Sequence, residues 1–228
     1  MKNPFKDFKI QEWVIYISSL IVVLFSNFAT GKVDFINLLG TIVGVTSLIF
    51  IAKGNVIGQM LSVLFGILYS ITAIKYRYYS EIITYLGMTG PLAVISIIIW
   101  LKNPFKKGES VVKIRLLTLK EGLFLMALTI IVTTIFYFVL KCLNTPNLFV
   151  GTVSIATSFV ASYLMVRRIS YYAVAFMCND IVLIVLWILA SIENLTYLSM
   201  IACFLAFLVN DLYAFTRWKI REKKQGLR

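Results

Sequence analysis

The chain has 228 residues, of which 60% are hydrophobic, and it carries a formal net charge of +12. Long apolar runs with short polar segments between them are typical of integral membrane proteins, so a soluble globular domain is excluded. The basic residues lie in loops and tails beside the apolar runs, which favours a membrane protein over a nucleic-acid-binding one. The chain has no histidine, and histidine is the commonest general base and a usual zinc ligand. Because a phosphate-binding loop and a recognisable nucleophile motif are missing too, we expect neither an enzyme nor a bound cofactor or metal.

Eight apolar runs are long enough to cross a bilayer as helices, at about 17 to 25 residues for each crossing. They predict an all-α integral membrane protein with spans at 13–29, 35–52, 55–75, 80–101, 120–141, 147–166, 171–190 and 196–218. Pro91 is the only proline deep within one of these runs. Since proline removes a backbone hydrogen bond, we expect a kink in the fourth span at this point.

Lysine and arginine are distributed unevenly between the two sides of the membrane that eight spans define. With the N-terminus inside, all 22 basic residues lie on the inner side except Lys32, Lys75, Arg77 and Lys141. Cytoplasmic loops of membrane proteins carry an excess of basic residues. We therefore expect both termini in the cytoplasm, which requires an even number of spans.

The longest and most basic connection, at 102–120, divides the chain into two halves. An offset of 118 residues aligns spans two to four with spans six to eight without a gap, and it places Trp100 on Trp218 and Tyr69 on Trp187. Three spans, a linker span and three spans make parallel repeats, the arrangement of sugar transporters of the SWEET type. We therefore expect an N-terminal tail and additional helix (1–30), a first repeat (35–101), a basic loop and linker helix (102–141), a second repeat (147–218) and a basic cytoplasmic tail (219–228).

Two Asn-Asp pairs lie within the last two apolar runs, Asn179-Asp180 and Asn210-Asp211. A carboxylate inside a hydrophobic span costs several kcal/mol to insert unless it faces a protein or water-filled interior. Such residues are therefore candidate site residues. They indicate a polar pocket inside the helical bundle.

Polar and aromatic residues also follow one face of the third span. Gln59, Ser62 and Tyr69 recur there at helical spacing, and Asp180 and Trp187 occupy the repeat-related face of the seventh span. Amides and carboxylates can bind sugar hydroxyls or a carboxamide, and aromatic faces attract a ring cation. We predict a substrate pocket between these faces, with Gln59, Ser62, Tyr69, Asn179, Asp180, Trp187, Asn210 and Tyr213 as its binding residues.

The aromatic candidates have a structural interpretation as well. Tyr69 and Trp187 lie in the outer thirds of their spans, where aromatic side chains form a belt at the membrane interface. Trp100 and Trp218 lie at the inner ends of theirs, and a belt is their simpler interpretation.

The polar candidates could instead join helices to one another. Gln59, Asn179 and Asn210 are suited to interhelical hydrogen bonds. An acidic residue could pair with one of the arginines near the inner ends of the spans, as Asp211 could with Arg217. Of the two acidic residues, we expect the one in mid-span, rather than Asp211, to lie in the pocket.

Three runs resemble bacterial nicotinamide riboside transporters of the Pnu type: GNVIGQ from Gly54, NDIVLIVLW from Asn179 and NDLYAFTRW from Asn210. The resemblance covers about residues 35–220. It implies a permease of the bacterial inner membrane that carries nicotinamide riboside by facilitated diffusion, drawn forward by a cytoplasmic riboside kinase. Matched by position, it points to Gln59, Tyr69, Asn179, Trp187, Asn210 and Tyr213.

Other substrates remain open at this stage, because related members take thiamine or riboflavin and a deoxynucleoside is a further candidate. A substrate-binding subunit of an ATP-driven vitamin transporter is an alternative class of protein. The expected partners are a small-molecule substrate, the lipid bilayer and the kinase, and no nucleic acid. The oligomeric state is not fixed by the sequence, and a homo-oligomer is one of the alternatives.

Overall fold

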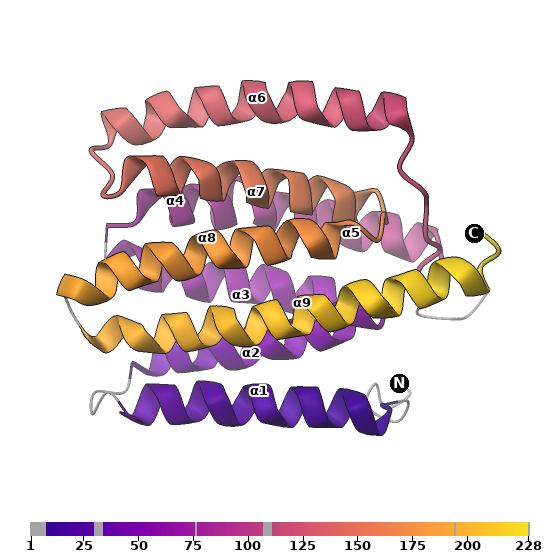
Figure 1. Cartoon of the computed structure of the whole chain (residues 1–228), viewed down its shortest axis with the longest axis horizontal. Helices are drawn as coiled ribbons and strands as arrows, with labels where there is room; N and C mark the ends of the chain where they lie inside the picture. Colours follow the sequence, from indigo (N-terminus) through magenta and orange to yellow (C-terminus); the bar gives the residue numbers. More distant parts are fainter. Residues whose placement is uncertain (1–7, 30–33, 76, 107–110, 194, 228) are drawn as a thin grey trace.

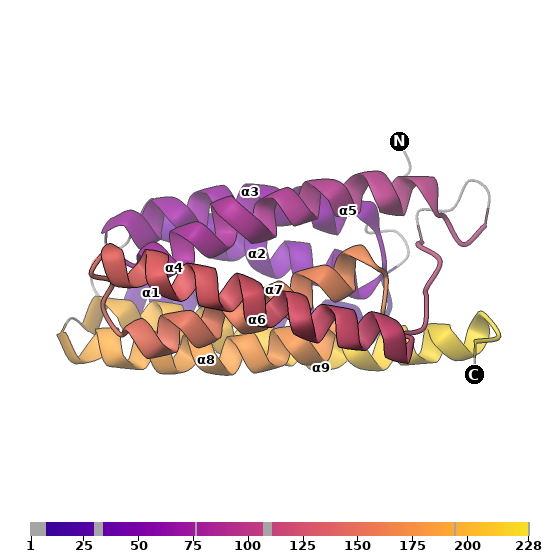
Figure 2. The same cartoon turned by 90° about the horizontal axis from the view of Figure 1, so that it is seen from above.

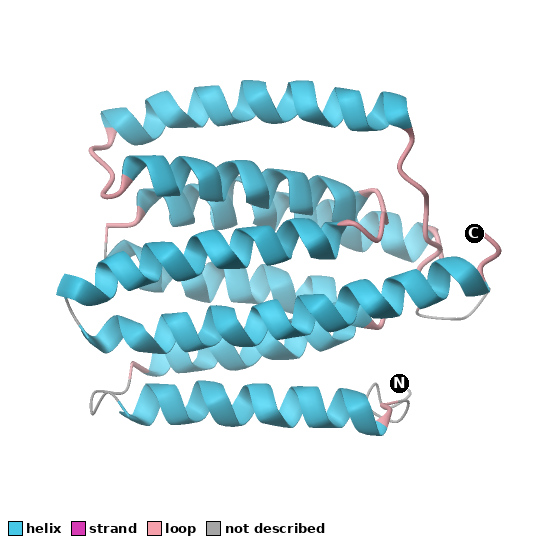
Figure 3. Ribbon diagram, viewed as in Figure 1, coloured by secondary structure: helices cyan, strands magenta, loops and turns pink. Residues whose placement is uncertain are grey.

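The computed structural model describes residues 8–29, 34–75, 77–106, 111–193 and 195–227, and these ranges are helical apart from turns and isolated bridges (Figure 3). The helices are α1 (Ile10–Ala29), α2 (Phe35–Ala52), α3 (Val56–Lys75), α4 (Tyr79–Ile82), the π-helix η1 (Ile83–Thr89), α5 (Gly90–Lys102), α6 (Leu119–Cys142), α7 (Leu148–Val166), α8 (Tyr172–Glu193), the 3-10 helix η2 (Leu195–Tyr197) and α9 (Leu198–Lys224). Within the described ranges, eight helical segments are long and apolar enough to cross a membrane, with α4, η1 and α5 forming one of them. The predicted fold class and number of spans are confirmed.

The helices run back and forth, so that α1 begins and α9 ends at the same end of the bundle (Figure 1). We call this the terminal end and the other the distal end. Helices α2 to α5 lie on one side and α7 to α9 on the other (Figure 2). At opposite edges, α1 packs on α2 and α9, and α6 packs on α7. The bundle therefore consists of two helix groups that face each other.

Helix α6 contributes little to the interior. Only Leu125 and Leu140 of its side chains are buried, whereas apolar residues such as Ile130 and Phe138 are exposed over more than half of their surface. In a bilayer such side chains face lipid, so the exposed apolar surface of α6 does not by itself indicate a partner protein.

The fourth span is interrupted at Pro91, the second residue of α5. Proline lacks the N–H that a regular helix would use there, and the wider π-helical turn η1 precedes it. Gly90 is required in this turn, because a Cβ atom at this position would lie 2.6 Å from the carbonyl oxygen of Tyr85. The expected irregularity is thus a π-helical segment, and it brings Tyr85 and Thr89 to the centre of the bundle.

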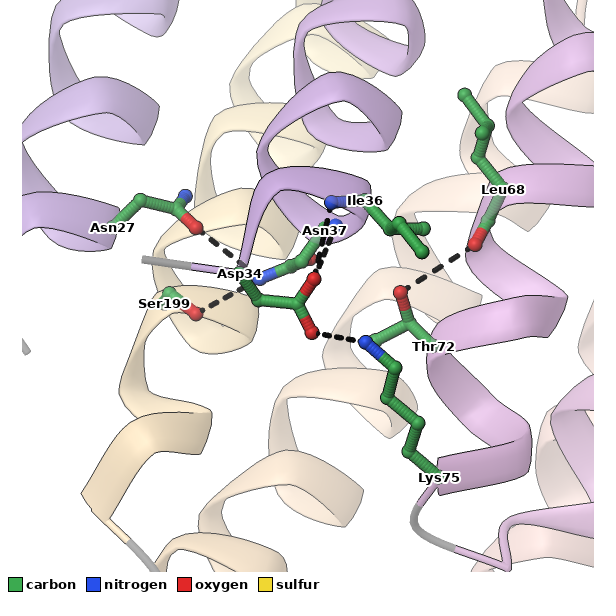
Figure 4. Close-up of polar contacts among 8 residues, drawn as sticks. All are labelled: Asn27, Asp34, Ile36, Asn37, Leu68, Thr72, Lys75 and Ser199. Atoms are coloured by element: carbon green, nitrogen blue, oxygen red, sulfur yellow. Dashed lines mark hydrogen bonds and ion pairs between the residues drawn. The ribbon is translucent and has the colours of Figure 1, made fainter. Parts of the chain in front are cut away.

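Polar contacts join four helices, α1, α2, α3 and α9, at the distal end (Figure 4). Asp34 caps α2 by accepting hydrogen bonds of 3.0 and 3.3 Å from two backbone N–H groups of its first turn, and it forms a 2.6 Å ion pair with Lys75. Burial alone would raise the pKa of Asp34, but the hydrogen bonds and the charge of Lys75 outweigh it and lower this pKa below its ordinary value. The Asn37 amide donates to Asn27 of α1 and Ser199 of α9.

The last helix differs most from the prediction, since α9 continues to Lys224 and not to 218. Its final turns carry charges, which end the apolar run without ending the helix. The Arg221 guanidinium donates to the Ala52 carbonyl oxygen at 3.0 Å, and Glu222 accepts a hydrogen bond from Ser170. Most of the segment expected to be a cytoplasmic tail is therefore a helical extension that contacts the α2–α3 and α7–α8 turns.

Candidate functional site

A partly open pocket lies between the two helix groups. Side chains from α2, α3, η1, α5, α7, α8 and α9 line it, and it encloses about 630 Å³ of empty space, its mouth included. Among the described residues that line it, none is a lysine or an arginine, whereas Asp180 and Asp211 both line it. The pocket therefore has a largely apolar wall that carries two acidic side chains.

Two predicted site residues of α3, Gln59 and Ser62, lie in the pocket wall. The Ser62 hydroxyl is hydrogen-bonded to the Ser47 hydroxyl at 2.7 Å. The Gln59 side-chain nitrogen donates to the sulfur of Met165 at 2.6 Å. Gln59 is 0% exposed, and its Oε1 atom has no hydrogen-bond partner among the described residues. A ligand with an N–H or O–H group would satisfy this acceptor.

The opposing wall contains Asn179 and Asp180 of α8, which were also predicted. The Asn179 side-chain oxygen accepts hydrogen bonds from the Thr157 and Ser158 hydroxyls of α7, both at 2.8 Å. These bonds hold the amide against α7. Asn179 therefore joins two helices and lines the pocket, so the two roles that the sequence left open for it are compatible.

Asp211 of α9, which was left out of the predicted site, faces Asp180 in the pocket. Each is 2% exposed, and both line the same pocket. Oδ2 of Asp180 and Oδ1 of Asp211 have no partner among the described residues. No described ion pair involves either residue, and Arg217 instead lies 5.9 Å from the ring of Tyr213.

Tyr69 and Trp187 lie beyond the pocket, toward the distal end. The Trp187 indole N–H donates to the Tyr69 hydroxyl at 3.1 Å, and this hydroxyl donates to Glu81 at 3.3 Å. Tyr85 and Phe204 pack against the Tyr69 ring with centroids at 4.5 and 5.8 Å. We call these five residues the distal layer. Their burial excludes the interface belt as the role of Tyr69 and Trp187.

Glu81 of the distal layer is a buried polar residue that the sequence analysis missed. It is 0% exposed, and its second carboxyl oxygen accepts a hydrogen bond from Ser154 of α7 at 3.0 Å. It is the second residue of the predicted span 80–101 and lies close to the basic residues Lys75 and Arg77. An acidic residue at the end of an apolar run is ordinary, so its position gave no signal of a buried site.

A second layer closes the pocket toward the terminal end. The Trp218 ring lies 5.6 Å from the Trp100 ring and 4.8 Å from that of Tyr172. Both indole N–H groups donate to backbone carbonyls of pocket residues, Trp218 to Ile51 at 3.0 Å and Trp100 to Met165 at 3.3 Å. We call Trp100, Tyr172 and Trp218 the proximal layer. The belt interpretation of Trp100 and Trp218 is wrong, because both are at most 1% exposed.

The two layers are related by the offset found in the sequence. Tyr69 and Trp187, hydrogen-bonded in the distal layer, are separated by 118 residues. The same offset separates Trp100 and Trp218, which pack together in the proximal layer. Equivalent residues of two repeats meet in this way when the repeats face each other across an approximate two-fold axis.

Asn210 and Tyr213, the remaining predicted site residues, do not line the pocket. They lie on the side of α9 that faces α1, where Asn210 donates to the Ser19 hydroxyl at 2.9 Å and the Tyr213 hydroxyl donates to Glu12 at 3.2 Å. Glu12 also forms a 2.9 Å ion pair with Lys53. These contacts attach α1 to the bundle.

A pocket with two acidic side chains that lies among membrane-spanning helices, between two layers of packed aromatic side chains, is typical of a membrane transporter. The Nicotinamide mononucleotide transporter family model matches residues 34–220, and the chain belongs to this family. A nicotinamide riboside transporter PnuC from Neisseria mucosa is 23% identical over 191 residues, covering 81% of this chain and 72% of that protein. The crystal structure of the vitamin B3 transporter PnuC has the same fold, with a TM-score of 0.85 at 20% identity over 97% of this chain and 95% of that one.

Proposed function

We propose that the protein carries nicotinamide riboside across the bacterial inner membrane. The observation that supports this most is the charge of the pocket, where two carboxyl groups meet no basic side chain among the described lining residues. Nicotinamide riboside is a pyridinium cation with a neutral ribose and a carboxamide. A carboxylate and aromatic ring faces both favour such a cation. The name of the Neisseria mucosa relative gives the same substrate for that protein.

The acidic pocket also favours the riboside over the mononucleotide in the description of the family model. The mononucleotide carries an additional phosphate group, which is anionic at neutral pH. In this pocket the phosphate would lie near Asp180 and Asp211, and the described lining residues include no lysine or arginine to pair with it. Burial of an unpaired charge costs several kcal/mol. We therefore assign the riboside, which lacks the phosphate group, as the substrate.

The pocket walls offer a partner for each polar part of the riboside. We assign the ring cation to Asp180 and Asp211 and the carboxamide N–H to the unpartnered oxygen of Gln59. Ser62 and Asn179 lie on opposing walls and would bind ribose hydroxyls. We expect Tyr69 and Trp187 to act as part of the distal layer and not by direct contact with substrate.

Transport in this proposal is facilitated diffusion by alternating access. The distal layer and the proximal layer each separate the pocket from one end of the bundle, and each would part in turn as the two helix groups rock. The excess of lysine and arginine assigns the terminal end to the cytoplasm. A cytoplasmic kinase that phosphorylates the riboside would then keep it inside, because the pocket does not accept the product.

Uptake into proteoliposomes that contain a riboside kinase and ATP tests the proposal. We expect labelled nicotinamide riboside to accumulate without any partner protein. Unlabelled riboside should compete, and the mononucleotide, thiamine and riboflavin should not. The double variant Asp180→Asn/Asp211→Asn should lose uptake, whereas the control Asp34→Asn, at the distal end of the bundle, should retain it. Flux that depends on an added ATPase would favour the ATP-driven alternative, and equal competition by the mononucleotide would exclude the substrate assignment.

A further inference from the structure

We propose that the turn between α7 and α8 binds a phosphate group, at the terminal end of the bundle that the proposed topology assigns to the cytoplasm. Arg168 is the central residue of this site, and Arg115 and Arg167 flank it. We call these three residues the arginine cluster. The phosphate of an anionic lipid in the inner leaflet is the source that fits its position best. The site is distinct from the transport pocket and does not depend on which substrate the protein carries.

Arg168 is a buried cation without a partner in the described part of the chain. It is 9% exposed, and its Nε and Nη1 atoms are shielded from solvent without a hydrogen bond to any described residue. No described ion pair involves it. Buried charges in folded proteins are normally paired. The third nitrogen, Nη2, is not enclosed in this way, so an anion can reach the guanidinium and pair with it.

The two flanking arginines share one carboxylate. Glu121 of α6 accepts a hydrogen bond from Arg167 and forms a 3.9 Å ion pair with Arg115. The backbone N–H of Arg115 donates to the carbonyl oxygen of Arg168 at 3.0 Å, which holds this segment against the turn. Burial and the charges of Arg115 and Arg167 lower the pKa of Arg168 below its ordinary value. Three guanidinium groups therefore lie beside one carboxylate, and the arginine cluster has an excess of positive charge.

A second acidic side chain at this turn is already paired elsewhere. Glu222 of α9 accepts a hydrogen bond from Ser170, two residues after Arg168, and forms a 2.9 Å ion pair with Lys219. No described ion pair joins Glu222 to the arginine cluster. The excess positive charge is therefore available to a ligand.

A phosphate group suits the arginine cluster in chemistry and in position. The planar fork of a guanidinium matches two oxygen atoms of a phosphate. The turn lies between the spans that end at Val166 and begin at Tyr172, and so at the level of the lipid headgroups. Leu119 and Leu123 at the start of α6 are exposed, so acyl chains can lie beside the cluster. Basic pockets between spans on the cytoplasmic side bind anionic headgroups in this way.

The corresponding turn of the first repeat shows that the backbone does not require an arginine here. Arg168 and Gly54 are each the second residue after the preceding helix, α7 and α2 respectively. Both have a left-handed backbone, with φ of 62° at Arg168 and 66° at Gly54. Glycine is the usual residue in this conformation, and other residues adopt it at a conformational cost. Replacement of Arg168 by glycine therefore removes the side chain without disturbing the turn.

Thermal unfolding of the purified full chain in an uncharged detergent tests the site. Phosphatidylglycerol should raise the melting temperature of the wild type in a saturable manner, because it binds the folded protein. Arg168→Gly should not lower the melting temperature without lipid, and it should lose most of the shift with lipid. The control Lys120→Gln removes one exposed charge at the same end of the bundle and should keep the shift. An equal loss of the shift in the control would show general charge attraction and overturn the site.

A second variant and two soluble probes complete the test. Arg168→Lys keeps the charge but not the planar fork, so it should also lose most of the shift. Inorganic phosphate and glycerol 3-phosphate, added in place of the lipid, distinguish the sources of the phosphate. A shift with phosphatidylglycerol alone identifies a lipid, and a shift with a soluble probe that is lost in Arg168→Gly identifies a soluble phosphate compound; either result supports the site.

Two results would overturn the phosphate site. One is the absence of a shift with every probe, and the other is a wild-type shift in both Arg168 variants. Riboside is absent from these measurements, so their outcome is independent of the proposed function.

Discussion

Removal of one oxygen atom, in Tyr69→Phe, should destabilise the bundle by loosening the distal layer. The Tyr69 hydroxyl accepts a hydrogen bond from the Trp187 indole at 3.1 Å and donates one to Glu81 at 3.3 Å. Phenylalanine keeps the ring and its packing but makes neither bond. The change therefore isolates the hydrogen bonds from the aromatic contacts.

The expected magnitude follows from these two bonds. A buried bond between neutral groups contributes about 0.5–1.5 kcal/mol net. Glu81 is fully buried and forms no described ion pair, so we count its bond in the same range. Glu81 also retains its hydrogen bond from Ser154, so it does not lose all of its partners. We expect the free energy of unfolding to fall by about 1–3 kcal/mol.

Equilibrium unfolding in mixed micelles titrated with SDS measures this difference. Tyr137→Phe is the matched control, because Tyr137 lies on α6 and its hydroxyl makes no described hydrogen bond. We expect that variant to stay within about 0.5 kcal/mol of the wild type, as most surface substitutions do. A loss in Tyr69→Phe no larger than in the control would show that these bonds do not hold the distal layer.

Two further substitutions test other parts of the structure. A Cβ atom at Gly44 would lie 2.5 Å from the ring of Phe207 and 3.0 Å from that of Phe65. Gly44→Ala should therefore lower the free energy of unfolding by about 1–3 kcal/mol through overpacking and weaken riboside binding. Thermal unfolding with and without riboside measures both effects, and wild-type melting temperatures in the two conditions would contradict the packing described. The lowered pKa of Asp34 means that its pairing with Lys75 stabilises the protein above the unfolded pKa of about 4 and is lost as pH falls through the lower folded value. Asp34→Asn keeps a capping side chain, so it should be less stable at pH 6 by under about 1 kcal/mol, since both partners are partly exposed. The difference should shrink as pH falls below about 4 and the Asp34 carboxylate of the wild type becomes protonated; a difference in melting temperature that stays constant with pH would refute it.

The number and approximate ends of the helices could be predicted from the sequence. A membrane-spanning segment needs a long apolar run, because its backbone groups must be satisfied inside the segment. Every predicted end lies within three residues of the observed one except the end of α9. There Arg221 and Glu222 are stabilised by contacts with loops of other helices, which no local pattern predicts.

Helical periodicity predicted the correct faces of α3 and α8 but not the depth of their residues. Ser62 and Tyr69 share one face, as do Asp180 and Trp187. Seven residues correspond to about 10 Å along a helix. The first residue of each pair lines the pocket, and the second lies beyond it in the distal layer. Depth depends on where the aromatic layers pack, and this is a tertiary property.

Asn210 and Asp211 show the limit of sequence reasoning most clearly. Consecutive residues of a helix point about 100° apart, so the two cannot face the same neighbour. Asn210 shares its face with Tyr213 and meets α1, whereas Asp211 shares its face with Phe207 and meets the pocket. Because α1 lies outside the repeats, their symmetry gave no indication of which side of α9 it covers.

The preference of the purified protein for nicotinamide riboside over its 5′-phosphate tests whether an acidic pocket, with no basic side chain among its described lining residues, selects a cation. Dissociation constants of both compounds, measured by calorimetry at pH 7, give this ratio. We expect the wild type to prefer the riboside at least about a hundredfold, equivalent to about 2.7 kcal/mol. The preference should be smaller in Asp180→Asn/Asp211→Asn. Equal or tighter binding of the phosphate by the wild type would contradict it.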